Sequence, residues 1–264
     1  MPESDLRSAV QTLGSAVIAY SGGVDSAVVL AICAQELGAS ALGVTGVSAS
    51  MARGELEAAV ALARAIGARH ETLETHEFDE AKYRANERDR CYHCKHELFS
   101  RLRALADERG IVHVVDGFNA DDGVAALDVR PGRGAARTLG VRSPLAETGF
   151  TKSDVRALAK KLGLSVWEKP ATPCLSSRVP YGTRIEEDDL RRIDLAESYL
   201  RASGFPVVRV RHFGSLARVE VPVADLRRLS EMRPRVERAF ADVGYVQLEI
   251  DARGYRTGSL NDKT

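Results

Sequence analysis

Short apolar runs alternate with longer amphipathic stretches over the first two thirds of the chain. The apolar runs are predicted as strands over 16–20, 41–47, 68–73 and 111–115. Helices are predicted between them over about 26–37, 54–66 and 95–109. Strands that alternate with helices indicate βαβ units. We therefore expect an α/β fold with a doubly wound parallel sheet that is covered on both faces.

One further helix and two irregular segments follow this alternation. A capping-box pattern, with Thr151 at the start and Asp154 three residues later, begins a helix that is predicted to run to Leu162. Residues 165–167 are predicted as a short strand. Residues 130–134, which contain a proline and two glycines, are predicted as a loop or lid.

The pattern changes at about residue 181. An acidic-to-basic helix over 186–202 precedes strands predicted over 207–213 and 217–223, a helix-rich stretch, and a last strand over 246–251. This αββαβ order predicts a second, smaller α+β domain. We therefore expect domains over 1–180 and 181–264, and we expect the tail from 257 to be disordered.

Charge and hydropathy narrow the classes of function. The 37 basic and 37 acidic residues among 264 give a formal net charge of zero, whereas proteins that grip long nucleic acids usually carry a basic excess. No apolar run approaches the roughly 20 residues of a membrane helix. The polar, acidic start does not resemble a secretory signal. We expect a cytoplasmic protein that binds neither nucleic acid nor membrane.

The segment Ser21-Gly22-Gly23-Val24-Asp25-Ser26 lies between the first predicted strand and the first predicted helix. The glycines allow a tight turn and a close backbone approach to a ligand, and amides at a helix start attract an anion. The segment lacks the Gly-Lys-Ser/Thr ending of a Walker loop and the GxGxxG dinucleotide pattern. It is therefore a candidate phosphate site of another kind, with a plain glycine-rich turn as the alternative.

The six residues resemble the PP-loop of the ATP pyrophosphatase superfamily, whose members activate a substrate as its adenylate. The resemblance implies that Ser21, Gly22, Gly23, Val24, Asp25 and Ser26 bind ATP, with Mg²⁺ bridging its phosphates and Asp25 essential for catalysis. Asp116 and Asn119 follow a predicted strand and fit the same site, although such residues also form turns. The segment Arg142–Leu145 resembles one that returns to the site in relatives.

Four cysteines offer further chemistry. Cys33 lies in an apolar helix and is predicted to be a buried structural thiol. Cys91 and Cys94 form one CxxC pair, which occurs in zinc sites, in redox sites and by coincidence. Cys174 lies in a polar loop together with Arg178, a setting that favours a reactive thiolate.

The PP-loop, the segment Arg90–Lys95 and the segment Pro173–Gly182 together resemble the LarE family over nearly the whole chain. The resemblance implies that the carboxylates of pyridinium-3,5-dicarboxylate mononucleotide are adenylated and converted to thiocarboxylates, on the route to a nickel-pincer nucleotide cofactor. In one style of the family a single cysteine, here Cys174, gives up its sulfur and becomes dehydroalanine. In the other, three cysteines hold a 4Fe-4S cluster. The pair Cys91 and Cys94 places this chain with the second style, with Cys174 as third ligand and a sulfide donor as partner.

The same resemblance assigns the remaining site residues. Ser177, Arg178, Arg209 and Arg211 would bind the substrate, Glu197 and Glu220 would bind a metal ion, and Arg178 would join Cys174 and Asp25 in catalysis. Arg209 and Arg211 alternate on a predicted strand and so share a face, but a solvated face with a salt bridge is the plain alternative. The smaller domain would bind substrate and form a homo-oligomer, with a hexamer as the expected form.

Other functions remain open. An ammonia-using ligase of the NAD or GMP synthetase kind shares the activation step but needs no thiol. A tRNA thiolase is disfavoured by the neutral charge, and a nucleotide sensor would bind ATP without releasing pyrophosphate.

Overall fold

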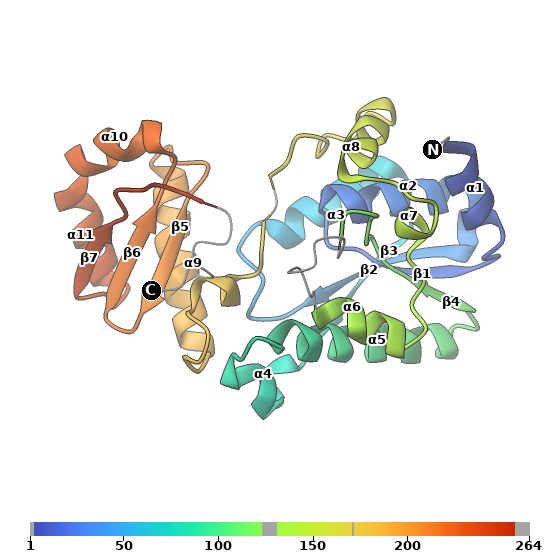
Figure 1. The fold of residues 1–264 in the computed structure, drawn as a ribbon, viewed down its shortest axis with the longest axis horizontal. Coiled ribbons are helices and arrows are strands. Elements are labelled where there is room, and N and C mark those ends of the chain that lie inside the picture. The colour runs from blue at the N-terminus through green and yellow to red at the C-terminus, as the bar shows by residue number, and fades with distance from the viewer. Residues whose placement is uncertain (1–2, 123–130, 171, 257–264) are drawn as a thin grey trace. The chain divides into compact units, whose positions relative to one another are not determined.

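The computed structural model describes residues 3–122, 131–170 and 172–256 (Figure 1). The chain divides into two compact units. The first contains Met1–Ser48, Gly54–Tyr83 and Arg88–Thr172, and the second contains Ala49–Arg53, Arg84–Glu87 and Pro173–Thr264. The second unit thus begins before the predicted boundary at 180 and includes two short earlier segments. The expected tail from 257 lies outside the described residues.

A four-stranded parallel sheet in the order β3-β2-β1-β4 forms the centre of the first unit. Its strands are β1 (Ala16–Ala19), β2 (Ala41–Val47), β3 (His70–Glu74) and β4 (His113–Val115). The register aligns Val17 with Leu42 on one side and with Val114 on the other. The parallel sheet predicted from the apolar runs is confirmed.

Helices cover both faces of this sheet, as Figure 1 shows. They are α1 (Glu3–Gln11), α2 (Val24–Leu37), α3 (Glu55–Ile66), α5 (Arg90–Glu108), α6 (Pro131–Thr138), α7 (Pro144–Glu147) and α8 (Lys152–Lys161), and the short helix α4 (Ala81–Ala85) precedes α5. Ile18 packs in a core with α1, α2, α3, α7 and α8. Val17, the residue before Ile18, packs in a second core with α5 and α6, because successive residues of a strand face opposite sides of the sheet. Both faces are therefore covered, which explains why the inner strands β1 and β2 are mostly apolar, whereas the edge strand β3 carries polar residues.

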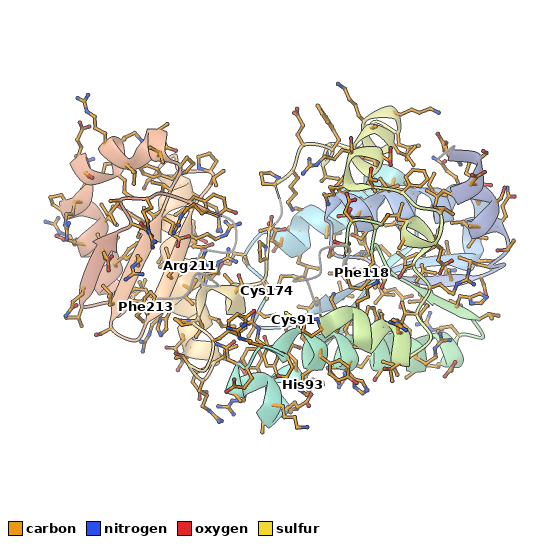
Figure 2. The ribbon with its side chains drawn as sticks, viewed as in Figure 1. Cys91, His93, Phe118, Cys174, Arg211 and Phe213 are labelled. Carbon is orange, nitrogen blue, oxygen red and sulfur yellow. The ribbon has the colours of Figure 1, made fainter. Side chains whose placement is uncertain are left out.

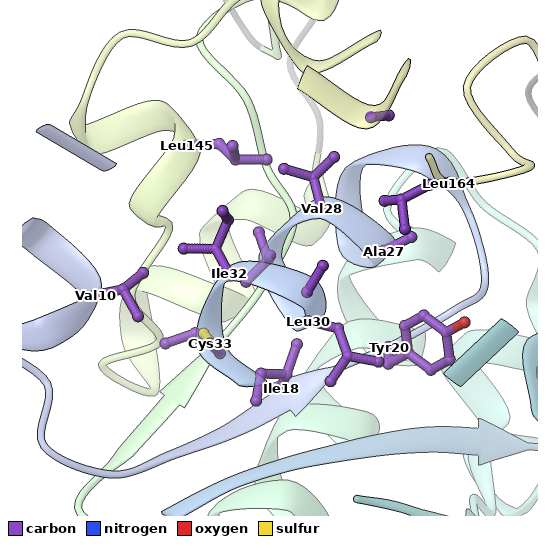
Figure 3. Close-up of a cluster of buried hydrophobic side chains, with 14 of the residues drawn as sticks. Val10, Ile18, Tyr20, Ala27, Val28, Leu30, Ile32, Cys33, Leu145 and Leu164 are labelled. Atoms are coloured by element: carbon purple, nitrogen blue, oxygen red, sulfur yellow. The ribbon is translucent and has the colours of Figure 1, made fainter. Parts of the chain in front are cut away.

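Helix α2 is the most deeply buried helix of the first core (Figure 3). Its residues from Ala27 to Cys33 are all buried, since it packs against β1 on one side and against α1 and α8 on others. Cys33 is fully buried, and burial raises the pKa of its thiol to about 12. The prediction of a structural thiol at this position is confirmed.

Two local predictions were wrong. Residues 165–167 form turns rather than a strand, because Arg156 binds the carbonyl oxygens of Trp167 and Lys169 and holds the segment against α8. Residues 131–134 begin helix α6 rather than a loop, because Pro131 suits a first helical position and Gly132 packs closely on Lys95 of α5. Residue 130 lies outside the described part of the chain.

The second unit contains a mixed three-stranded sheet in the order β5-β6-β7. Its elements are α9 (Glu187–Ala202), β5 (Arg209–Phe213), β6 (Leu216–Glu220), α10 (Leu226–Glu231), α11 (Arg233–Asp242) and β7 (Gln247–Ile250). Strands β5 and β6 are antiparallel, whereas β7 runs parallel to β6 after the crossover through α10 and α11. The core contains Leu200, Phe205, Val210, Val219 and Phe240. The predicted small α+β architecture is confirmed.

Short 3₁₀ turns complete the described elements: η1 (Gly38–Ser40), η2 (Glu77–Asp79), η3 (Leu175–Arg178) and η4 (Val223–Asp225). Within the described ranges, no helix combines the length and apolarity that crossing a membrane requires.

The burial of Cys33 leads to a prediction about stability. A Cys33→Ser change places a hydroxyl in an apolar site, so we expect the free energy of unfolding to fall by roughly 1–3 kcal/mol. Chemical denaturation measures this change, and Cys33→Ala is the matched control because it removes the sulfur without adding a polar group. Catalysis by the folded fraction should be unchanged. A serine variant as stable as the alanine variant would contradict the assignment.

Candidate functional site

The candidate nucleotide site lies at the carboxyl edge of the parallel sheet. After β1 the chain forms β2 and β3 on one side of that strand, and it then forms β4 on the other side. The strand order therefore reverses between β1 and β4, which makes this position the topological switch point. Doubly wound folds bind ligands at this position. The PP-loop follows β1, and the segment Asp116–Asn119 follows β4.

The PP-loop is closed by its own serines. The amide of Ser21 donates to Ser26 Oγ at 3.2 Å, and Ser26 Oγ donates to the carbonyl of Gly23 at 3.1 Å. The two serine hydroxyls lie 3.2 Å apart. The loop is therefore tied across its base, with Ser21 exposed and Ser26 buried.

Gly22 is required by both conformation and space. Its φ is +72°, and an added Cβ would lie 2.9 Å from the Cβ of Ala59 on α3. The adjacent Tyr20 hydroxyl donates to the carbonyl of Ala59 at 3.0 Å, which fixes the strand end against the same helix. A side chain at this position would therefore both strain the backbone and clash with α3.

The loop ends at the N-terminus of α2. Gly23 occupies the N-cap position and has no side chain with which to cap the first amides of the helix. The 14-residue helix directs the positive end of its dipole toward this point. The arrangement suits a phosphate group.

Asp25 is held by two residues from other elements. Asn119 Nδ2 donates to Asp25 Oδ1 at 3.0 Å, and Lys152 Nζ forms an ion pair with Asp25 Oδ2. Lys152 is placed by the capping box at the start of α8, where Asp154 N donates to Thr151 Oγ1 and Thr151 N donates to Asp154 Oδ2. The predicted capping box is confirmed. Lys152 was not predicted from the sequence as a site residue, although it lies inside the capping box, between Thr151 and Asp154.

Asp116 directly follows β4, and its side chain is buried, with 4% of the residue exposed. Its Oδ1 accepts from Ser143 Oγ at 2.7 Å and from Phe118 N at 3.1 Å, whereas its buried Oδ2 has no hydrogen-bond partner among the described residues. Burial raises the pKa of this carboxyl to about 6. A Cβ on Gly117 would lie 2.8 Å from Ser26 N, so the segment after β4 packs directly on the PP-loop.

Ser143 comes from the segment that was expected to return to the site. Arg142 forms a parallel bridge with Val115, and Asp116 N donates to the carbonyl of Arg142 at 2.9 Å. The segment therefore extends the sheet beyond β4 and delivers Ser143 to Asp116.

Cys91 and Cys94 lie in the first turns of α5, in the first unit. Cys91 is exposed, Cys94 is partly exposed, and residues three apart share one side of a helix. Because α5 leads into β4, its first turn lies at the carboxyl edge of the sheet. His93, between the two cysteines, is buried and pairs with Glu80 at 2.7 Å and with Asp89 at 3.2 Å. His93 therefore serves to fix the start of the helix.

Cys174 is the exposed N-cap residue of η3 in the second unit. Figure 2 labels it on the turn that precedes α9. In the described part of the chain, no group of three or more Cys, His, Asp or Glu side chains is arranged to hold a metal ion. Cys91 and Cys94 belong to the first unit and Cys174 belongs to the second, and a cluster held by these three thiols stays a prediction.

Arg178 organises the turn that carries Cys174. Its side chain is fully buried and makes a bidentate pair with Glu197 of α9, at 2.8 Å and 3.0 Å. Its Nη1 donates to the carbonyls of Pro173 and Cys174, at 2.6 Å and 3.0 Å, and to Ser177 Oγ at 3.0 Å. The turn is therefore wrapped around one guanidinium group.

Arg209 and Arg211 of β5 lie in the same unit and are 7% and 6% exposed. Arg211 pairs with Glu220 at 2.8 Å and donates to the carbonyl of Ser177 at 2.9 Å. Arg209 donates to the carbonyl of Val208 at 2.7 Å, and its pKa is lowered by burial and by the charge of Arg178. The predicted strand position of both arginines is confirmed, and both are buried rather than solvated.

Glu197 also accepts from Arg201 at 2.5 Å and from Val210 N at 3.0 Å. It thus binds two guanidinium groups and a backbone amide. In the structure both Glu197 and Glu220 form ion pairs with arginines, and their metal-binding roles stay predictions. We use the name arginine cluster for the four cations and two carboxylates: Arg178, Arg201, Arg209, Arg211, Glu197 and Glu220.

The fold and the loop after β1 define a PP-loop nucleotide-binding protein. A family model for NAD synthase matches residues 3–108, the part that contains the PP-loop. An uncharacterised protein of Synechocystis is 43% identical over 99% of this chain and 98% of its own length. The pyridinium-3,5-bisthiocarboxylic acid mononucleotide synthase of Lactiplantibacillus plantarum is 36% identical over 98% of this chain and 94% of its own length. An uncharacterised protein of Methanocaldococcus jannaschii is 29% identical over 91% of the chain and 90% of its own length.

The chain therefore belongs to the LarE family, and it is an ATP-dependent synthase of the PP-loop type. The predicted family and enzyme class are confirmed. The three-cysteine style and the individual site residues stay predictions.

The buried Asp116 carboxyl predicts a pH-dependent stability. Its folded pKa is raised from 3.8 to about 6, so the stability it contributes is present at low pH and is lost as the pH rises through 6. Asp116→Asn keeps an oxygen for Ser143 and Phe118 but cannot ionise. The free energy of unfolding of this variant, relative to that of the native protein, should therefore rise by roughly 2 kcal/mol between about pH 4.5 and pH 8.

Denaturant unfolding at the two pH values measures this difference. The control is Asp107→Asn, which changes an exposed carboxylate near the end of α5 and should show no such growth. An Asp116→Asn effect that is the same at both pH values would refute the buried, ionisable assignment.

Proposed function

We propose that this chain adenylates the carboxylates of pyridinium-3,5-dicarboxylate mononucleotide with ATP and converts them to thiocarboxylates. The L. plantarum relative is named as the synthase of the bisthiocarboxylic acid mononucleotide. The similarity covers nearly the full length of both chains and includes the second unit as well as the PP-loop. The product would enter nickel-pincer nucleotide biosynthesis.

The observation that carries the proposal is the arginine cluster. Its six groups comprise four guanidinium groups and two carboxylates, and Arg178, Arg209 and Arg211 are buried. Guanidinium groups gathered in one place suit a ligand of negative charge. The phosphate of a mononucleotide has this charge, and guanidinium groups bind it through paired hydrogen bonds. Ser177, which contacts Arg178 and Arg211, would lie at the same phosphate.

The PP-loop would hold the β- and γ-phosphates of ATP. The amides at the start of α2, which no side chain caps, and the hydroxyl of Ser21 would provide donors, and Lys152 would provide the cation that the loop itself lacks. Asp25 pairs with that cation and Asn119 binds Asp25, so both would orient Lys152. Asp116 and Asn119 stay candidate ATP-binding residues, and Mg²⁺ would bridge the phosphates. A substrate carboxylate oxygen would attack the α-phosphorus, and pyrophosphate would leave with both terminal phosphates.

Sulfur delivery is proposed to use a 4Fe-4S cluster on Cys91, Cys94 and Cys174. The donor set fits this group: the first two thiols are neighbours on one helical turn, and Cys174 is exposed at the start of a turn. Thiolates are the usual ligands of iron–sulfur clusters. When bound, a cluster with three protein ligands supplies an open iron site for an external sulfide. The alternative is a sacrificial Cys174 that ends as dehydroalanine.

An ammonia-using ligase is the second candidate, since the NAD synthase family model matches residues 3–108, most of which belong to the first unit. It would share ATP activation but would need none of the exposed thiols. The arginine cluster and the full-length similarity favour the sulfur transferase. A homo-oligomer, with a hexamer as the expected form, remains part of the proposal.

An anaerobic reaction with ATP, Mg²⁺, the dicarboxylate mononucleotide and sulfide tests the proposal. We expect about four iron atoms per chain, thiocarboxylate formed over many turnovers, and Cys174 intact in the protein mass. Cys91→Ser should lose the iron and the turnover but keep substrate-dependent pyrophosphate release, because it does not touch the PP-loop. Cys33→Ala is the matched cysteine control and should behave as the native protein.

Three results would count against parts of this proposal. Iron-free protein after reconstitution, with Cys174 converted to dehydroalanine, would replace the cluster by the sacrificial route. Amidation of the substrate by ammonia with no thiol dependence would establish the ligase. Absence of pyrophosphate release with this substrate would reject the proposed substrate.

A further inference from the structure

We propose that Asn86 is a positioning residue that sets the turn carrying Cys174, Ser177 and Arg178. Residues 84–87 lie between helices of the first unit in sequence, yet they belong to the second unit by their contacts. The catalytic consequence of this inference rests on the proposed function, whereas its structural part does not.

Asn86 is completely buried and has a φ of +58°. Its side-chain Nδ2 lies within hydrogen-bond distance of three carbonyl oxygens, those of Pro180 at 2.8 Å, Thr183 at 2.9 Å and Val179 at 3.4 Å. Its own carbonyl accepts from Gly182 N at 3.0 Å. One asparagine therefore binds the chain on both sides of the bend that follows η3.

Residues 49–53, which also belong to the second unit, hold the other end of the turn. Leu175 N, the first residue of η3, donates to the carbonyl of Ser50 at 2.8 Å. Arg53 then binds Asp194 of α9 through its backbone amide at 3.0 Å and through its side chain at 2.9 Å. The turn is thus held at its start by residues 49–53 and after its end by Asn86.

The residue type explains the choice of asparagine. A positive φ is adopted readily by glycine and, among other residues, most often by asparagine and aspartate. Glycine would keep the backbone conformation but would lose the amide donor. Aspartate would keep the shape but would turn a carboxylate toward carbonyl oxygens. Asparagine alone among these three satisfies both requirements.

The turn matters because it connects directly to the arginine cluster. Arg178 leaves η3 to bind Glu197, and the carbonyl of Ser177 accepts from Arg211 at 2.9 Å. A shift of residues 179–183 would therefore move the groups proposed to bind the substrate phosphate. The PP-loop lies in the other unit.

The experiment compares Asn86→Gly and Asn86→Asp with Glu87→Gln, a change at the exposed neighbouring residue. Amide hydrogen exchange is measured on the full chain, together with the KM for the dicarboxylate mononucleotide and the KM for ATP. We expect both Asn86 variants to exchange faster over 175–185 while β1–β4 keep native rates. The KM for the mononucleotide should rise roughly tenfold or more, since that factor equals the loss of one hydrogen bond to a charged group. The KM for ATP and the Glu87→Gln control should stay within about twofold of native values.

Asn86→Gly retains the left-handed backbone, so it keeps the test available if Asn86→Asp fails to fold. Native exchange over 175–185 in the glycine variant would overturn the positioning role. Equal increases in both KM values would also overturn it, because they would indicate general destabilisation. If the native protein itself releases no pyrophosphate with this substrate, the proposed function fails, and the exchange rates alone decide the role of Asn86.

Discussion

The buried pair between Arg178 and Glu197 is the interaction on which the second unit depends. Arg178 binds the carbonyls of Pro173 and Cys174, and Glu197 also accepts from Arg201 and from the amide of Val210. One ion pair thereby joins the cysteine turn, helix α9 and strand β5. Removing one partner of such a pair leaves an uncompensated buried charge, which typically costs about 3–5 kcal/mol. We therefore expect this pair to hold the turn, the helix and the strand together.

The two proposed phosphate sites differ in a way that suits their tasks. The PP-loop offers amides and hydroxyls, and the neighbouring cation Lys152 is already paired with Asp25. The arginine cluster offers several buried guanidinium groups. Pyrophosphate must leave after each activation, whereas a substrate with two carboxylates benefits from staying bound while both are converted. We infer that moderate charge at the first site and high charge at the second follow from this difference.

Much of the fold could be predicted because its signals are local. Apolar runs identified the parallel strands, a capping pattern identified α8, and an apolar helix identified Cys33 as a core residue. The wrong strand at 165–167 and the wrong loop at 131–134 depended on contacts with α8 and α5 that no local pattern records.

Lys152 and Asn86 escaped prediction for the same reason, since their partners lie about a hundred residues away in sequence. The arginines of β5 could be predicted from the sequence as candidate site residues. Whether they form a solvated salt bridge or a buried cluster could not be predicted, because burial depends on packing.

The central claim is that a substrate carboxylate is activated as its adenylate before sulfur is added, and oxygen isotope transfer tests it most directly. The dicarboxylate mononucleotide is labelled with ¹⁸O in its carboxylates and incubated with ATP, Mg²⁺ and sulfide under anaerobic conditions. If the carboxylate attacks the α-phosphorus and sulfur then expels AMP, the bridging oxygen leaves with AMP. The account predicts a single ¹⁸O in each AMP formed, in step with thiocarboxylate. Unlabelled AMP, or label in pyrophosphate or phosphate, would contradict it.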